Sequence, residues 1–188
     1  MNKRVLIYWA TGSQLSETLV PFDIFKRAGL IVQLVASDNS PDYSLSHDFK
    51  IANPMSLSEF KKTHLIEEMD ALMIPGGKLG VHHLDLDEGV DYLLEEFSKN
   101  NKLIAAICAG PSILGRRGYL KDKNYTCYPG WAFDAFNGNY TGKEVERCGN
   151  LITARSMYYS ADFALEVVEY LLGKDKRIEI EKQIKGIQ

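Results

Sequence analysis

The stretch KLIAAICAGP, residues 102–111, decides the fold because it joins a buried strand to a helix. A continuous apolar run that ends at Cys108 is typical of a strand covered on both faces. Gly110 permits a sharp turn, and Pro111 has the fixed φ angle that suits the first turn of a helix. We therefore expect Cys108 to lie at an elbow between a strand and a helix.

Similar apolar runs occur elsewhere in the chain and predict further buried strands: RVLIYWA (4–10), IVQLVAS (31–37) and ALMIP (71–75). A helical pattern with apolar residues at 15, 19, 22 and 25 separates the first two runs, and VDYLLEEFSKN (90–100) is a second amphipathic helix. Buried strands that alternate with helices predict a doubly wound α/β sandwich, in which a mainly parallel sheet has helices on both faces.

The C-terminal part of the chain adds two kinds of element. Residues 144–156 form two short runs around Gly149 and Asn150, which predicts a small β-hairpin. A strong helical pattern follows over 160–173, with Ser160 as its expected N-cap and Gly173 at its end. The charged residues 174–188 are expected to form an appended helix.

Length and composition indicate one globular domain over residues 1–188. The net charge of −3 identifies no partner class, and we expect no nucleic-acid partner. No apolar run approaches the roughly 20 residues of a membrane span, so we expect no membrane partner and a cytoplasmic location. Three cysteines without CxxC spacing indicate reduced thiols, and the four histidines lack zinc-site spacing, so we expect no metal and no cofactor.

Three features fall at the carboxyl ends of predicted strands, where open α/β sheets bind ligands. Cys108 ends one strand, Gly76 and Gly77 follow another, and Glu17 lies in the helix after the first strand. A helix N-terminus can lower the pKa of a cysteine from about 8.5 to roughly 3.5–7.5, which would make Cys108 a thiolate nucleophile. The alternative is a small cysteine packed beneath the helix.

The neighbours of Cys108 fit a nucleophilic role. The backbone N–H groups of Gly77 and Ala109 are candidate donors to an oxyanion, although a Gly-Gly pair is often only a turn. Glu17 is commonly just a partner of the helix dipole, but Pro21 cannot donate to the carbonyl of residue 17, which predicts a kink or a helix start there. Beside a thiolate, Glu17 would keep its proton and act as the general acid/base.

Four motifs, AAICAGP, IPGGKLG, SETLVPFDIFKRAG and LITARS, resemble the ThiJ/PfpI superfamily in order and spacing. The resemblance is closest to the branch of the Parkinson-associated protein deglycase and its bacterial relatives, and it covers nearly the whole chain. It implies a flavodoxin-like sandwich, a homodimer, a reactive cysteine at Cys108 and a protonated Glu17. Gly77 and Ala109 match the oxyanion donors, and Arg155 matches an arginine at the dimer-facing edge of the pocket. Gly76, Tyr128 and Arg155 are therefore candidates for the substrate pocket.

The sequence departs from the superfamily at two positions. Peptidase members have a histidine directly after the cysteine, where this chain has Ala109, so a dyad of that kind is absent. The deglycase branch usually has a histidine before the proline of a later loop, where this chain has Tyr128. A phenol with a pKa near 10 is a weak base at neutral pH, so Tyr128 is either a hydrogen-bond donor at the pocket or a packed aromatic residue. Cys127 is either packed or a resolving thiol, and Cys148 is expected to be structural.

These observations lead to three hypotheses. The first is a cysteine-dependent enzyme that acts on a small aldehyde or a glycated substrate, of glyoxalase (α-oxoaldehyde hydratase) or deglycase type. The second is a redox sensor or stress-response protein in which Cys108 is oxidised to a sulfinic acid beside protonated Glu17. The third, a cysteine peptidase or amidase, is weakened by Ala109.

Overall fold

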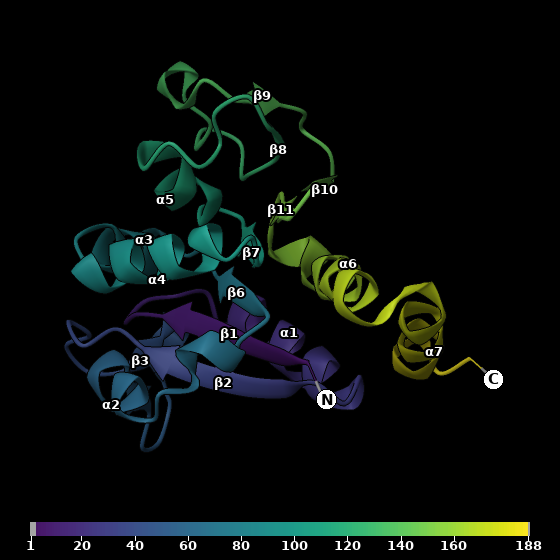
Figure 1. Ribbon diagram of the computed structural model, residues 1–188, viewed down its shortest axis with the longest axis horizontal. Helices are drawn as coiled ribbons and strands as arrows, with labels where there is room; N and C mark the ends of the chain where they lie inside the picture. Colours follow the sequence, from purple (N-terminus) through teal and green to yellow (C-terminus); the bar gives the residue numbers. More distant parts are fainter. Residues whose placement is uncertain (1–2, 188) are drawn as a thin grey trace.

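The computed structural model describes residues 3–187. Its main sheet has seven strands in the order β10-β11-β7-β6-β1-β2-β5 (Figure 1). The central strands are β1 (Arg4–Trp9), β6 (Ala71–Ile74), β7 (Leu103–Ile107) and β2 (Ile31–Ala36), and β5 (Met55–Ser56) and β11 (Leu151–Ala154) extend the parallel part. All four predicted strands are present, which confirms a flavodoxin-like, doubly wound sheet.

The strand β10 (Val145–Cys148) is antiparallel to β11 and closes one edge of the sheet. Cys148 pairs with Leu151 across the turn, and Gly149 has the positive φ of 61° that such a turn requires. The hairpin predicted around Gly149 and Asn150 is therefore confirmed. Two small two-stranded sheets lie outside the main one: β3 (Ser44–Leu45) with β4 (Phe49–Lys50), and β8 (Asn124–Tyr125) with β9 (Asn139–Tyr140).

Helices cover both faces of the sheet (Figure 1). One face packs against α2 (Leu57–Lys62), α3 (Lys78–Asp85), α4 (Glu88–Lys99) and α5 (Pro111–Arg116). The other face packs against α1 (Leu15–Arg27), α6 (Ser160–Leu172) and α7 (Lys174–Lys185). Successive residues of β1 point to opposite faces of the sheet. Leu6 and Tyr8 pack with α2–α5, the first helical layer, and Val5 and Ile7 pack with α1, α6 and α7, the second helical layer. Burial on both faces explains why the strands are continuously apolar.

Two sequence expectations about helix ends need correction. Ser160 is the first residue of α6 and not its N-cap, and its hydroxyl donates to the carbonyl of Met157 at 2.7 Å. The helix α1 begins at Leu15 and runs through Pro21, which excludes a helix start at the proline and leaves the kink as a prediction. The appended helix is present as α7, and α6 ends at Gly173 as expected.

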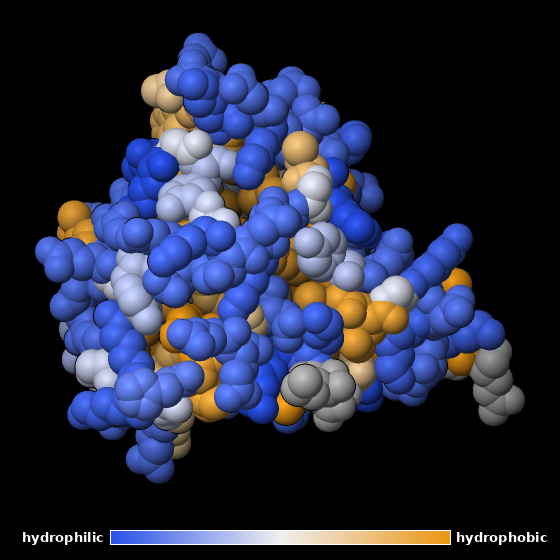
Figure 2. All heavy atoms as spheres, in the orientation of Figure 1, coloured by the Kyte–Doolittle hydropathy of each residue, from blue (hydrophilic) through white to orange (hydrophobic). Residues whose placement is uncertain are grey.

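Figure 2 shows a mainly hydrophilic surface on the face it presents, with apolar residues in patches between the elements. Among residues 3–187, no helix is both long enough and apolar enough to span a bilayer.

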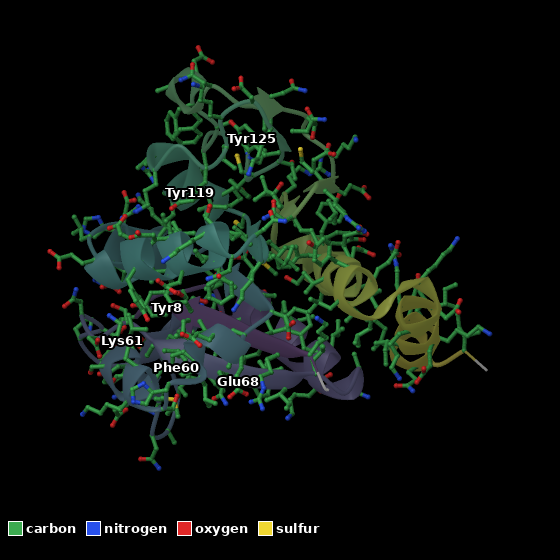
Figure 3. The ribbon with its side chains drawn as sticks, viewed as in Figure 1. Tyr8, Phe60, Lys61, Glu68, Tyr119 and Tyr125 are labelled. Carbon is green, nitrogen blue, oxygen red and sulfur yellow. The ribbon has the colours of Figure 1, made fainter. Side chains whose placement is uncertain are left out.

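A buried polar contact ties the central strand to the first helical layer. Tyr8, labelled in Figure 3, is fully buried on β1. Its hydroxyl donates to the carboxylate of Asp87, the N-cap of α4. Asp87 also accepts from the backbone N–H of Gly89 at 2.9 Å, and burial raises the pKa of Tyr8 well above its usual value. The phenol is therefore a neutral donor that compensates a buried carboxylate.

We predict that Tyr8→Phe lowers the free energy of unfolding by about 1–3 kcal/mol, because it leaves the buried Asp87 carboxylate without its phenol donor. Urea denaturation followed by circular dichroism measures this change. The matched control is Tyr119→Phe, which removes the hydroxyl of a half-buried tyrosine that donates to no side chain or carbonyl among residues 3–187. Equal effects of the two substitutions would contradict the role assigned to the Tyr8 contact.

Candidate active site

Cys108 lies between the end of β7 and the start of α5, at the elbow that the sequence predicts. Its φ of 62° is in the left-handed region, which is unusual for a residue with a side chain. Two backbone hydrogen bonds of 2.8 Å hold it there: its N–H donates to the carbonyl of Ala154, and its own carbonyl accepts from the N–H of Tyr128. The neighbouring strand β11 and the loop after β8 therefore fix this conformation.

Gly76 is the point at which the predicted site residues meet. A Cβ atom at this position would lie 2.7 Å from Oε2 of Glu17, 2.9 Å from the backbone nitrogen of Ala109 and 2.9 Å from Cβ of Cys108. The N–H of Gly76 donates to Oε2 of Glu17 at 2.9 Å. Only a residue without a side chain leaves room for all three neighbours. The fold thus brings together α1, the end of β6 and the end of β7 at one edge of the sheet.

Glu17 is almost completely buried, with 1% of its surface exposed. Burial raises the pKa of its carboxyl group to about 7, while a hydrogen bond with the Cys108 side chain and the N–H of Gly76 act in the opposite direction. Its other oxygen, Oε1, has no hydrogen-bond partner in the described part of the chain. A carboxyl group with these properties can hold or release a proton near neutral pH.

The pKa of the Cys108 thiol is raised, first by burial and then by the charge and hydrogen bonding of Glu17. The backbone N–H groups of Ala109 and Gly77 interact with the sulfur and lower the pKa, but they do not outweigh burial. This direction is opposite to the one that the position before a helix predicts. The helix α5 has only six residues, and the Cys108 side chain is half-buried.

A cavity of about 280 Å³ opens in front of these groups. Its inner wall contains Glu17, Gly77, Cys108 and Ala109, so four of the predicted site residues line one space. Tyr128 also lines the cavity, and 48% of its surface is exposed, which places it at the rim rather than in the core.

The structure places Arg155 and Cys127 outside the cavity lining. The guanidinium group of Arg155 donates to the carbonyl of Gly142 at 3.2 Å and to the hydroxyl of Tyr159. Cys127 is fully buried in the core of the first helical layer, and burial raises the pKa of its thiol to about 12. Neither side chain lines the cavity in front of Cys108, and Cys127 has no exposed surface.

Sequence reasoning did not identify four further residues that line the cavity: Gln14, Lys78, Trp131 and Met157. Lys78 directly follows the glycine pair, which was a usable signal. Gln14 and Met157 are distant in sequence, but their side chains meet, with Nε2 of Gln14 3.7 Å from Sδ of Met157. Such a contact depends on the packing of α1 near the start of α6 and leaves no local pattern in the sequence.

Within residues 3–187, no three side chains of histidine, cysteine, aspartate or glutamate gather as metal ligands would. A carboxyl group, a thiol and two backbone amides are suited to bind and protonate a carbonyl oxygen.

Comparisons with known proteins agree with this geometry. Residues 3–170 match the model of the DJ-1/PfpI family. The Parkinson disease protein 7 homolog of Danio rerio is 32% identical over 182 residues, 95% of each chain. The glutathione-independent glyoxalase DJ-1 of Schizosaccharomyces pombe is 28% identical over 187 residues, which cover 96% of this chain and 97% of the relative.

The crystal structure of Drosophila melanogaster DJ-1beta superimposes on this chain with a TM-score of 0.87. The two sequences are 30% identical, and the alignment covers 100% of each chain. The fold, the order of the motifs and the length of the match therefore agree with the resemblance found in the sequence. On this evidence the chain belongs to the DJ-1/PfpI family.

Proposed function

We propose that the protein is a cysteine-dependent enzyme that converts small α-oxoaldehydes to hydroxy acids, in the manner of a glutathione-independent glyoxalase. The observation that carries this proposal is the meeting of Glu17, Cys108 and two backbone amides around Gly76, at the wall of an open cavity. The name of the Schizosaccharomyces pombe relative supports the reaction class.

In the first step, the sulfur of Cys108 adds to the aldehyde carbon of the substrate. A carbon–sulfur bond forms, and the electron pair of the C=O π bond moves to oxygen, which accepts hydrogen bonds from the N–H groups of Gly77 and Ala109. Because the thiol pKa is raised, its proton must be taken up as the sulfur attacks. Glu17, with a pKa of about 7, is partly ionised at neutral pH and can accept that proton.

In the second step, Glu17 gives the proton that it took from the thiol to the oxygen of the adjacent carbonyl group. A second proton then leaves the former aldehyde carbon of the hemithioacetal and is delivered to the adjacent carbonyl carbon. The first carbon is thereby oxidised to a thioester and the second is reduced to an alcohol, so no external oxidant or reductant is needed. Glu17 is the group that carries this proton in the proposal. One water molecule then hydrolyses the thioester, which releases the hydroxy acid and restores the Cys108 thiol.

We predict that Cys108→Ala abolishes the formation of lactate from methylglyoxal, because no sulfur remains to form the hemithioacetal. Glu17→Gln should lower kcat by about 10²–10⁴-fold, the usual contribution of a general acid/base. Lactate is measured with an enzymatic assay after fixed times.

The matched control for this experiment is Cys148→Ala, which removes a half-buried thiol on the edge strand β10. It should change the rate by no more than about twofold, since substitutions away from a site have small effects. The proposed function is wrong if the wild-type protein forms lactate no faster than Cys108→Ala.

We also predict a pH-dependent contribution of Glu17 to stability. Its pKa in the folded protein, about 7, is above the ordinary value of 4.5, so folding favours the neutral carboxyl group. This stabilisation is fully present below about pH 4 and is lost as the pH rises through about 7. Between pH 5 and pH 8, wild type should therefore lose about 2–3 kcal/mol of unfolding free energy relative to Glu17→Gln. Urea denaturation of both proteins at each pH measures the difference, and a constant difference would contradict a buried neutral Glu17.

A further inference from the structure

A second cavity, of about 480 Å³, adjoins the one at Cys108. Lys78 and Trp131 line both cavities, so these two side chains form the boundary between them. The volume of the second cavity lies within the roughly 300–1,000 Å³ of pockets that hold drug-sized ligands, whereas the first is slightly smaller than that range. A three-carbon aldehyde at Cys108 would leave the second cavity unfilled.

The second cavity is built from three separate elements. Lys78, Val81, His82 and Asp85 occupy positions i, i+3, i+4 and i+7 of α3 and so share one face of that helix. Arg116 comes from the last turn of α5. The third element is the loop after β8: the N–H of Trp131 donates to the carbonyl of Tyr128 at 3.0 Å, which links the wall of the second cavity to the rim of the first.

The charges around this cavity are unbalanced. The carboxylate of Asp85 is shared between Arg117, at 2.9 Å, and Arg116, at 3.4 Å. Arg117 is also paired with Asp91. Lys78 forms no ion pair within residues 3–187, so a positive charge remains beside a largely apolar wall that includes Trp131. The Nη1 atom of Arg116 donates to the hydroxyl of Ser112 at 2.9 Å, which orients the guanidinium group at the other end of the cavity.

We propose that the second cavity is a subsite for the tail of the substrate, and that it takes an aromatic or branched apolar group that ends in a carboxylate. The inference rests on the proposed function, because it places the reactive aldehyde at Cys108. The apolar part of the tail packs against Trp131 and Val81, and the carboxylate pairs with Lys78 and Arg116. The substrate class is then an acidic α-oxoaldehyde longer than methylglyoxal.

The test compares two unreactive ketones, 4-acetylbenzoate and its methyl ester. Both have the same aromatic ketone skeleton, and only the first carries a negative charge. Isothermal titration calorimetry on the wild-type protein should give an affinity about fivefold higher for the acid, in line with a partly exposed charged contact. Arg116→Gln should reduce this preference to about twofold or less, and Lys78→Gln should reduce it in the same direction. Arg116→Lys is the matched control, since it retains the positive charge and should retain most of the preference.

A kinetic measurement locates the bound ketone. If the tail subsite continues into the site at Cys108, 4-acetylbenzoate should raise the KM for methylglyoxal without lowering kcat. Equal affinity for the acid and the ester, an acid preference that survives both Arg116→Gln and Lys78→Gln, or binding without competition would each overturn the subsite. Calorimetry does not depend on turnover, so a protein that forms no lactate but binds the acid as expected would refute only the proposed function.

Discussion

The close approach of three chain segments at Gly76 is the constraint on which the rest of the site depends. The carboxyl group of Glu17, the side chain of Cys108 and the amide of Ala109 all lie where a side chain at this position would be. These groups can meet only because β6 and β7 are neighbours in the sheet and because the first turn of α1, which carries Glu17, lies at the same edge. It also requires Cys108 to adopt a left-handed backbone conformation, which the hydrogen bonds to Ala154 and Tyr128 maintain. The geometry of the reactive groups is thus a consequence of sheet order.

Burial at this edge affects the two titratable groups in different ways. For Glu17 it brings the pKa into the neutral range, where proton transfer is useful. For Cys108 it opposes ionisation, and an ionised Glu17 adds to that opposition. The two groups are therefore best regarded as a coupled pair whose protons belong to both. A carbonyl compound that enters the cavity offers an oxygen to which negative charge can move, so the thiol need not be ionised in the resting protein.

The loop after β8 and the first turn of α3 border the cavity at Cys108. Tyr128 lies at the rim, and the loop that carries it also carries Trp131, which separates the two cavities. Lys78 follows directly after the glycine that supplies one of the amides. Lys78 is therefore next in sequence to Gly77, whereas Tyr128 and Trp131 are brought to the cavity from a separate loop. Neither segment contributes a residue to the close contact at Gly76, which Glu17, Cys108 and Ala109 form.

The sequence by itself determined the order of the elements, the parallel character of the sheet and the elbow at Cys108. These features are local: they follow from continuous apolar runs, from helical spacing and from the conformations that Gly110 and Pro111 permit. It also indicated Glu17, Gly76 and Gly77, because parallel strands place their carboxyl ends at one edge. Only the tertiary structure decided the direction of the Cys108 pKa, the position of Arg155 outside the cavity and the contributions of Gln14, Trp131 and Met157. Each of these depends on how deeply a group is buried and on which distant segment packs against it, and no local pattern of residues encodes either.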